Sequence, residues 1–581
     1  MTAIIYIYIW EGSIVMSKRI KLIIISVAVI AVAVISALLV YKFSPNKERK
    51  PLDECFDVSG DEMAILLQDE YSEEKGYCYD GVPYVKYSLV KERFNKRFYW
   101  EQNPGVMIYT TTDAVMKFTP DTAEYQSNKA SKTMDYIPVR MINDQPYVAV
   151  PFVKEYSNIT YSFYEKPNRV IINYKWDDNE LTTTVKKKTV IRYEDNIKSP
   201  IIADVAQGDK LICVGMDEQI KNGFSKVITI DGVVGYISNK KIEESSYEKF
   251  VSDYTEPEYT HNLKDYNICL AWHQVTSQVA NESVLKVLNE TKGVNTISPT
   301  WFKITDNNGS VKSIASERYV ERAHAAGVEV WGLCDDFSEE VDMTVLLGNM
   351  ETREKLENKL LSLAIEFELD GINLDFEKIK QDGAESFIQF VREMSVKCKN
   401  NGIVLSIDNY VPVSYREYYN YEEQGKYADY IIIMAYDEHY SGSDEAGSVS
   451  SINYVDSACK NIVEKVDAKQ VVMALPFYTR LWTVKNEGTD KQSLECATYS
   501  MENAEKLLRD RGLTPSWNDE TAQYYAEYDE DGAKNKIWLE DEKSLGEKLK
   551  SITSNGLSNV AFWKLGLEKR AVWNEVSKYI K

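Results

Sequence analysis

The sequence predicts an α/β fold: an eight-stranded parallel barrel over residues 262–581, preceded by a small all-β barrel, a duplicated α+β module and one transmembrane helix. Three observations lead to this prediction. A chain of 581 residues is too long for a single ordinary domain. The last part alternates short apolar runs with helical segments, which is typical of a parallel sheet. The earlier parts show different patterns: an uncharged apolar run, an internal repeat and a series of short alternating strands.

The N-terminal apolar run, residues 22–40, contains no charged side chain. As a helix it would span roughly 29 Å, close to the thickness of a bilayer core. It is longer than the apolar part of a signal peptide, so we expect an uncleaved anchor more than a cleaved signal. Residues 1–21 would be a cytoplasmic tail, starting at Met1 or Met16, and residues 41–57 a linker. Lys and Arg flank both ends, so charge does not decide the orientation.

An internal repeat marks residues 58–177. Pro83-Tyr84-Val85 recurs as Pro146-Tyr147-Val148, and Val90-Lys91-Glu92 recurs at the same offset as Val153-Lys154-Glu155. A constant offset indicates a duplicated unit, here a strand followed by a helix. The segment resembles the N-terminal domain of copper amine oxidases, found as a stalk on surface proteins. No copper is implied, because no histidine precedes His261.

Short strands with turn signals follow over residues 178–245. Residues 224–230 alternate between apolar and polar before Asp231-Gly232, a strong hairpin signal. This segment resembles a bacterial SH3-like domain, a module common on wall enzymes. Wall binding and a role as a spacer both stay open, because a fold does not fix a function. Residues 246–261 would be a second linker.

Eight strands are expected in the last part, at residues 268–272, 296–300, 328–334, 371–376, 404–408, 430–435, 471–475 and 559–563. Helical segments lie between them, for example residues 313–325 and 454–466. Eight strand–helix units of this total length predict a TIM barrel. Its largest insertion, which includes residues 493–539, follows the seventh strand and should form one wall of a cleft.

The fourth strand carries the most informative pattern, Asp370-Gly371-Ile372-Asn373-Leu374-Asp375-Phe376-Glu377. Its apolar and polar residues alternate, so Asn373, Asp375 and Glu377 share one face. A solvated edge strand would show the same alternation. However, this strand lies between two helical segments, and carboxylates on a strand covered on both faces need a purpose. Two such acids can serve glycosidic bond cleavage, in which one acid must keep its proton.

Further candidates follow the carboxyl ends of other strands, where chemistry sits in such barrels. Carboxylates beside aromatic rings make a sugar site, because the apolar face of a pyranose packs on rings. Each candidate also has a plain structural reading: core packing for Trp563 and Tyr436, capping for Asp408, and charge neutralisation for Arg480. The complete set of candidates is Glu377, Asp375, Tyr436, Asp437, Trp563, Asn373, Asp408, Arg480 and Trp482.

Residues 370–377 resemble the Asp-Gly-x-Asp-x-Asp-x-Glu signature of family 18 glycoside hydrolases, the chitinase-like family. Met434-Ala435-Tyr436-Asp437 resembles the sixth-strand motif of the family, and Trp563 its eighth-strand tryptophan. One position departs, since Asn373 stands where the family usually has Asp. An amide still forms hydrogen bonds but cannot share a proton, so a changed pH profile is expected rather than inactivity.

The resemblance implies a role for each matching residue. Glu377 would be the general acid and later the base, and Asp375 and Tyr436 would hold the N-acetyl group of the substrate. Asp437 would contact the sugar, and the ring of Trp563 would form the floor of the sugar subsite. The nucleophile would be the substrate's own acetamido oxygen, with net retention and no metal or other cofactor.

Residues 298–302, Ser-Pro-Thr-Trp-Phe, and residues 436–443 resemble a subgroup that contains spore-cortex and cell-wall N-acetylglucosaminidases. Peptidoglycan is therefore the leading substrate, and chitin or its oligomers is the alternative. A non-catalytic glycan-binding surface protein is a third reading, and it would need a lost acid. We expect a single-pass protein of the cell membrane with its catalytic domain outside the cytoplasm.

Composition narrows the partners. The net charge of −22 at pH 7, with no basic stripe to offset it, argues against binding of nucleic acid. None of the eight cysteines forms a Cys-x-x-Cys pair, which argues against a zinc or redox site. His273 and His439 lack metal-ligand spacing. The expected partners are therefore a polysaccharide and, through the N-terminal helix, the membrane.

Overall fold

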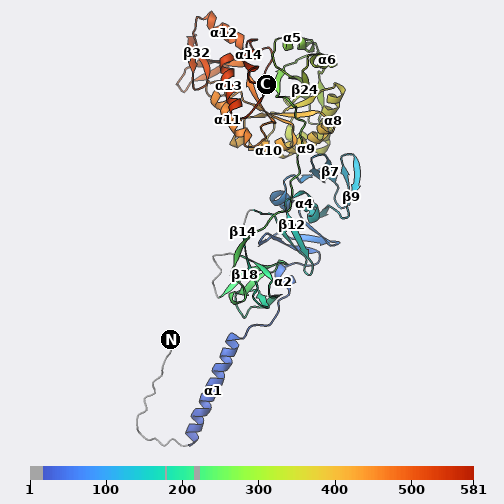
Figure 1. Cartoon of the computed structure of the whole chain (residues 1–581), viewed down its shortest axis with the longest axis vertical. Coiled ribbons are helices and arrows are strands. Elements are labelled where there is room, and N and C mark those ends of the chain that lie inside the picture. Colours follow the sequence, from blue (N-terminus) through green and yellow to red (C-terminus); the bar gives the residue numbers. More distant parts are fainter. Residues whose placement is uncertain (1–17, 177–178, 215–222, 581) are drawn as a thin grey trace, which may run out of the picture. The chain divides into compact units, whose positions relative to one another are not determined.

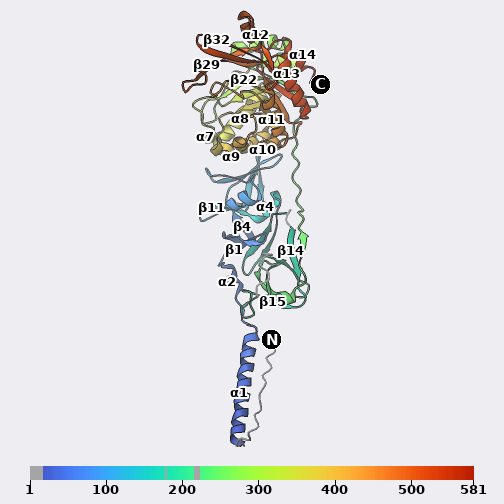
Figure 2. The same ribbon diagram turned by 90° about the vertical axis from the view of Figure 1, so that its left-hand side faces the viewer.

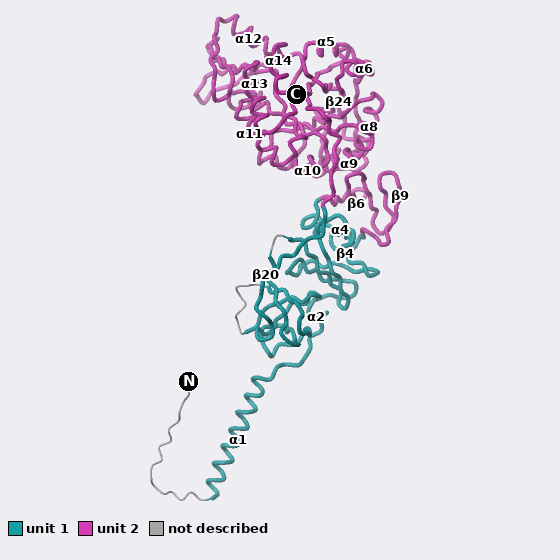
Figure 3. Tube along the Cα trace, viewed as in Figure 1, with its two compact units in different colours: residues 1–96, 140–255 teal, residues 97–139, 256–581 magenta. Residues whose placement is uncertain are grey.

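The computed structural model of the chain describes residues 18–176, 179–214 and 223–580 (Figures 1 and 2). Most of the predicted N-terminal tail, residues 1–17, lies outside this part. The chain divides into two compact units, residues 1–96 with 140–255 and residues 97–139 with 256–581 (Figure 3). Residues 97–139, which the sequence places within the repeat module of residues 58–177, thus belong to the same unit as the barrel.

The predicted membrane span lies within helix α1, Lys18–Phe43. Among the described residues, α1 is the one helix that is long and apolar enough to cross a membrane, and a stretch of 18 residues within it has a mean hydropathy of 3.2. Its length and composition make it a candidate for a membrane-spanning or signal segment.

The repeat of the first unit forms two hairpins that pair with each other. β3 (Gly76–Tyr79) and β4 (Val82–Lys86) form the first hairpin, and β10 (Val139–Ile142) and β11 (Gln145–Ala149) the second. β4 and β11 are antiparallel neighbours, so the two copies pair with each other within one sheet. The sheet order is β10-β11-β4-β3-β1-β13-β12, with β2 beside β1. Its remaining elements are β1 (Glu62–Leu67), β2 (Glu70–Tyr71), β12 (Thr160–Tyr164) and β13 (Arg169–Asn173), with helices α2 (Leu52–Phe56), α3 (Tyr87–Leu89) and α4 (Val150–Tyr156).

The second part of this unit is an antiparallel seven-stranded sheet of order β16-β15-β19-β18-β17-β14-β20. The expected hairpin is present: Gly232, with φ +83°, turns the chain between β18 and β19. The strands are β14 (Asn179–Thr184), β15 (Thr189–Arg192), β16 (Ile201–Val205), β17 (Lys210–Cys213), β18 (Phe224–Thr229), β19 (Val234–Ser238) and β20 (Ser246–Lys249). The all-β architecture is confirmed, and the likeness to an SH3 domain stays a prediction.

All eight predicted barrel strands are present, and they close into a parallel barrel because β21 pairs with both β34 and β22. The second strand continues past its expected end and forms a hairpin with β23 (Val311–Ser313). The barrel strands are β21 (Cys269–His273), β22 (Thr296–Ile304), β24 (Glu329–Asp335), β25 (Gly371–Asp375), β26 (Val404–Tyr410), β27 (Tyr430–Met434), β28 (Val471–Pro476) and β34 (Asn559–Trp563).

Helices cover the outside of the barrel (Figure 1). The alternation predicted on the fourth strand separates two cores: Ile372 and Leu374 pack outward against the helices, whereas Asn373 faces the interior beside Trp272. The helices of this unit are α5 (Val284–Asn289), α6 (Glu317–Ala325), α7 (Met343–Leu347), α8 (Met350–Glu366), α9 (Ala384–Lys399), α10 (Tyr421–Tyr427), α11 (Ile452–Val463), α12 (Met501–Asp510), α13 (Glu542–Ser554) and α14 (Val572–Val576).

The insertion after the seventh strand begins at Tyr478, earlier than the segment named from the sequence. It is a five-stranded antiparallel sheet of order β30-β29-β33-β32-β31, which packs against α12. Its strands are β29 (Tyr478–Lys485), β30 (Ser493–Ser500), β31 (Ser516–Asn518), β32 (Gln523–Glu530) and β33 (Ala533–Leu539).

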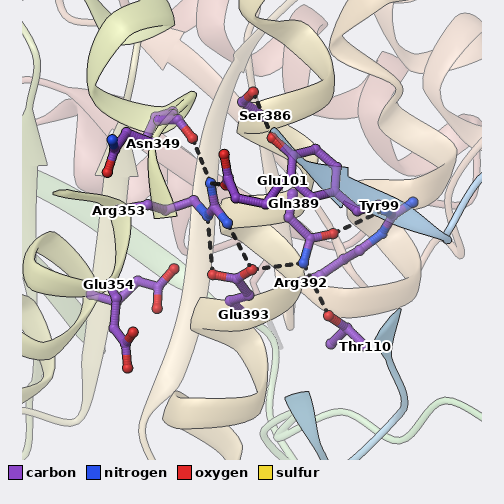
Figure 4. Close-up of polar contacts among 12 residues, drawn as sticks. Tyr99, Glu101, Thr110, Asn349, Arg353, Glu354, Ser386, Gln389, Arg392 and Glu393 are labelled. Atoms are coloured by element: carbon purple, nitrogen blue, oxygen red, sulfur yellow. Dashed lines mark hydrogen bonds and ion pairs between the residues drawn. The ribbon is translucent and has the colours of Figure 1, made fainter. Parts of the chain in front are cut away.

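Residues 97–139 contain a five-stranded sheet that contacts the barrel helices through buried polar groups (Figure 4). Arg353 on α8 is fully buried and pairs with Glu393 on α9 and with Glu101 on β5, each at 3.1 Å. Gln389 extends the network to Thr110 at 3.2 Å. The strands are β5 (Tyr99–Glu101), β6 (Val106–Thr110), β7 (Val115–Phe118), β8 (Glu124–Ser127) and β9 (Ala130–Thr133).

A second cluster in the same contact joins Arg97 and Arg392 to one carboxylate, Glu423 on α10, at 2.9 and 2.6 Å. Although burial alone would raise the pKa of Glu423, the two guanidinium groups lower it to about 2. Buried charges persist in proteins when they are paired in this way. The paired charges fix the sheet of residues 97–139 to the barrel.

Candidate active site

A cavity of about 620 Å³ opens at the carboxyl ends of the barrel strands. Six of the nine residues proposed from the sequence line it: Asp375, Glu377, Asp408, Tyr436, Asp437 and Trp563. Trp272, Phe337, Tyr410, Tyr415, Arg416, Met434, Glu438, Tyr440 and Tyr454 complete the lining. Asn373, Arg480 and Trp482 lie outside the lining.

Glu377 follows the end of β25 and is held from two sides. The hydroxyl of Tyr410 donates a hydrogen bond of 2.6 Å to Oε2 of Glu377, and the backbone N–H of Glu377 donates to Asp336 at 3.1 Å. Burial raises the pKa of Glu377, and the negative charge of Asp437 adds to the rise, while the Tyr410 bond and Arg416 oppose it. A carboxyl with a raised pKa keeps its proton to higher pH, as a general acid requires.

Asp375, the last residue of β25, is buried beside the cavity. Burial raises its pKa well above the usual range, and repulsion from Asp408 and Glu377 contributes. Its Oδ1 accepts no hydrogen bond from the described residues. A buried carboxyl oxygen without a donor costs free energy, and a substrate N–H would satisfy it.

Asn373 lies in the barrel interior and does not line the cavity. Its Oδ1 accepts hydrogen bonds of 2.9 Å from Nε1 of Trp272 and from the hydroxyl of Ser298. Its Nδ2 donates to Oδ1 of Asp408 at 2.8 Å. Burial raises the pKa of Asp408 well above its usual range, although the Asn373 bond opposes the rise. Asn373 thus holds residues of the cavity instead of contacting what enters it.

Tyr436 and Asp437 follow the sixth strand. Asp437 has a φ of +54°, and its Oδ1 accepts hydrogen bonds from the hydroxyl of Tyr478 at 2.6 Å and from Arg480 at 2.7 Å. Arg480 therefore orients a residue of the cavity from outside it. The ring of Tyr436 packs edge-on against that of Tyr478.

Eight of the fifteen lining residues are aromatic, which favours a ligand with flat apolar faces. Trp563 lies edge-on to Trp272, with ring centroids 5.9 Å apart. Phe337, Tyr415 and Tyr440 are exposed to solvent by 44, 72 and 53%. Large rings held in water beside a cavity are suited to contact an extended chain of sugars.

Trp482 does not fit the expected role of a sugar contact. Its side chain is 1% exposed, and its Nε1 donates to the backbone oxygen of Gly447 at 2.8 Å. The ring packs within the insertion and supports the loop that follows the sixth strand. The sequence shows that a tryptophan is present, but the alternation of β29 decides that it points inward.

The set proposed from the sequence leaves out several residues of the site, among them Tyr410, Arg416, Trp272 and Asp336. Tyr410 ends the fifth strand, two residues after Asp408, so the same alternation could have found it. Arg416 lies over the Tyr410 ring at 3.9 Å. Asp336 accepts the backbone N–H groups of Glu377 and Lys378, and burial raises its pKa to about 6. Such a backbone contact leaves no signal in a sequence.

Comparison with known families matches both units. Residues 340–568 match the glycosyl hydrolases family 18, and residues 67–172 match the copper amine oxidase N-terminal domain. The first match contains the strand with Asp375 and Glu377, the Tyr436-Asp437 pair and Trp563. The second confirms the resemblance of the repeat module.

Individual relatives agree with the family match. The chain is 24% identical over 303 residues to the uncharacterized glycosylase YvbX of Bacillus subtilis, covering 50% of this chain and 85% of that protein. It is 25% identical over 247 residues to the cortical fragment-lytic enzyme of B. subtilis, covering 41% of this chain and 56% of the relative.

Among the solved structures that match the barrel region at the level of fold is the spore cortex-lytic enzyme SleL of Bacillus cereus, with a TM-score of 0.50 and 18% identity over 58% of this chain and 77% of that one. The closed parallel barrel, the acids on its fourth strand and the family match agree. The barrel of this chain is a glycoside hydrolase domain of family 18.

Proposed function

We propose that this protein is a membrane-anchored N-acetylglucosaminidase that cleaves the β-1,4 bond after N-acetylglucosamine in peptidoglycan, outside the cytoplasm. One observation carries the proposal: Asp375, whose buried Oδ1 accepts no hydrogen bond from the described residues, lines the same cavity as Glu377, whose pKa is raised by burial. An acetamido N–H is a donor that would satisfy Asp375, and a protonated Glu377 is the acid that the glycosidic oxygen needs.

In the proposed reaction, Glu377 donates its proton to the glycosidic oxygen while the acetamido oxygen of the same sugar attacks the anomeric carbon. The bond between that carbon and the leaving oxygen breaks, and an oxazolinium ion forms. The carboxylate of Glu377 then takes a proton from water, whose oxygen attacks the anomeric carbon and displaces the acetamido oxygen, so that the acetamido group is restored. Two displacements at one carbon give net retention.

Four lining residues would hold the reacting sugar. Asp375 accepts the acetamido N–H and stabilises the positive charge of the oxazolinium ion. The Tyr436 hydroxyl bonds to the acetamido oxygen. The ring of Trp563 supports the apolar face of the sugar, and Asp437, oriented by Tyr478 and Arg480, contacts its hydroxyls.

The choice of peptidoglycan rests on the relatives, which include a cortical fragment-lytic enzyme and a sporulation-specific glycosylase. The apolar helix α1 supports anchoring at the membrane, beside the wall polymer. Chitin is the second candidate, because it presents the same sugar in the same linkage and a probable chitinase also matches the chain.

A parallel digest tests the choice of polymer. The full chain in detergent is offered peptidoglycan and chitin oligomers separately, and the new reducing ends are identified by mass spectrometry. The proposal predicts N-acetylglucosamine ends from peptidoglycan. Turnover of chitin alone would establish the second candidate. Binding of either glycan without any product would make the barrel a non-catalytic glycan-binding module.

A further inference from the structure

A second cavity adjoins the first at the catalytic acid. It has a volume of about 660 Å³ and is formed by the loop after β24 and the segment after β25, with Glu377 in its lining. Asp375, Tyr436 and Trp563 belong only to the first cavity. If the sugar whose anomeric carbon is attacked occupies the first cavity, the second cavity lies on the other side of Glu377, beside the leaving sugar.

The two cavities differ in chemistry. Eight of the fifteen residues of the first are aromatic, whereas none of the ten residues of the second is. A pyranose ring therefore finds no stacking platform in the second cavity. Its volume also exceeds what a single small substituent of a sugar would fill, since cavities of about 300–1,000 Å³ hold whole ligands.

Charges of both signs line the second cavity. Glu339 and Glu340 are exposed, and neither forms an ion pair with the described residues. Lys378 donates to the backbone oxygens of Phe337 and Ser338, each at 3.1 Å, and pairs with no carboxylate in the described ranges. Lys380 differs, because Asp342 neutralises it at 2.8 Å.

We propose that this second cavity is a subsite for a peptide attached to the leaving sugar, with Glu339 and Glu340 binding its ammonium group and Lys378 its carboxylate. The inference rests on the proposed function and specifies its substrate as a peptide-bearing glycan. A purely acidic substituent would fit less well, because two unpaired carboxylates face it. A neutral sugar would leave all three charges without a partner.

The test compares three soluble substrates of equal glycan length with the full chain in detergent: peptide-bearing, peptide-free, and peptide-bearing with its free amine acetylated. The readout is the ratio of kcat/KM on the peptide-bearing glycan to that on the peptide-free glycan. We expect the wild-type ratio to be at least about tenfold, and to fall as salt screens the charges. Lys378→Met and the double variant Glu339→Gln, Glu340→Gln should each lower it by about fivefold, the effect of one partly exposed charge pair.

Two controls separate binding from a disturbed loop. Lys286→Met on α5, an exposed lysine outside both cavities, should leave the ratio unchanged. The double variant should make no further difference on the acetylated substrate, because the ammonium group is already absent there. The peptide subsite would be overturned if the wild type cleaved peptide-bearing and peptide-free glycan equally and the variants left the ratio unchanged. The proposed function would still stand in that case. No cleavage of either glycan would overturn the proposed function itself.

Discussion

Nδ2 of Asn373 donates a hydrogen bond of 2.8 Å to Oδ1 of Asp408 in the barrel interior. An amide makes this donation at every pH, whereas a carboxyl group at the same position could donate only while protonated. The single departure from the family signature therefore replaces a titratable contact by a permanent one.

Asn373→Asp should retain turnover at acid pH, and its pH profile of kcat should differ from that of the wild type on the alkaline side. Two carboxyl groups about 3 Å apart in a buried site must share a proton, so the pKa of the pair is raised. A carboxyl whose folded pKa is raised stabilises the fold below its unfolded pKa of about 4 and loses that contribution as pH rises.

The free energy of unfolding of this variant should therefore fall further below wild type by about 1–3 kcal/mol between pH 5 and pH 8. Thermal unfolding and kcat across this range measure both effects. A constant stability gap together with coincident pH profiles would contradict the role assigned to Asn373.

Tyr410→Phe should move the alkaline limb of the pH profile of kcat to a higher pH, by about one unit. The lost hydrogen bond favours the ionised form of Glu377, so its removal raises the pKa of the acid. Asp437→Asn should move the limb in the opposite direction, because it removes a neighbouring negative charge. Tyr525→Phe, on the insertion sheet, is the matched control and should leave the limb in place. Shifts of the same sign in Tyr410→Phe and Asp437→Asn would rule out this electrostatic account.

Arg353→Met should lower the free energy of unfolding by about 3–5 kcal/mol, because Glu393 and Glu101 would stay buried without their cation. Burial alone would raise the pKa of Glu393, yet Arg353 lowers it to about 2. The stabilisation by this pair is present above the unfolded pKa of about 4 and is lost as pH falls toward 2. The difference in free energy of unfolding between the wild type and Arg353→Met should therefore become smaller at acid pH.

Lys117→Met is the control for this contact. Lys117 pairs with Glu354 on α8 at 2.9 Å, but both side chains are partly exposed, and their loss should cost less than about 1 kcal/mol. Chemical denaturation of both variants at pH 7 makes the comparison. Equal losses would mean that the buried network does not hold the sheet of residues 97–139 to the barrel.

Trp563→Ala and Trp482→Phe should fail in different ways. Trp563 lines the cavity, so its truncation should raise KM about tenfold or more through lost ring contact with the sugar. Trp482 is buried, and its replacement by Phe should leave KM within about twofold while lowering stability by about 1–2 kcal/mol, the cost of the orphaned Gly447 oxygen. An equal rise in KM for both variants would mean that Trp482 contacts the sugar, as the sequence predicted.

The barrel could be predicted from the sequence because its buried strands are short apolar runs, and all eight strands were predicted. The sequence was also sufficient for residues whose position at a strand end decides their place, such as Asp375, Asp408 and Trp563. The sequence did not predict that Asn373 and Arg480 lie outside the cavity and hold two of its lining residues in place. Their hydrogen bonds to Asp408 and Asp437 depend on which side chains the folded barrel brings together.

The place of residues 97–139 could not be predicted. Arg97 and Glu423, which form one of its ion pairs with the barrel, are 326 residues apart in the chain. Nothing in the local pattern links them, since paired charges far apart in sequence look like ordinary surface residues. The repeat correctly indicated a duplicated module, but a repeat does not show what each copy packs against.

Glu377→Gln tests the central claim most directly. Glutamine keeps the size of the side chain but cannot donate the proton that the leaving oxygen needs. Wild type, Glu377→Gln and the exposed control Glu464→Gln are incubated with peptidoglycan, and new N-acetylglucosamine reducing ends are counted by mass spectrometry. The account predicts ends from wild type and from Glu464→Gln, and a loss of about a thousandfold or more in Glu377→Gln with glycan binding retained. Equal cleavage by all three proteins would show that Glu377 is not the catalytic acid.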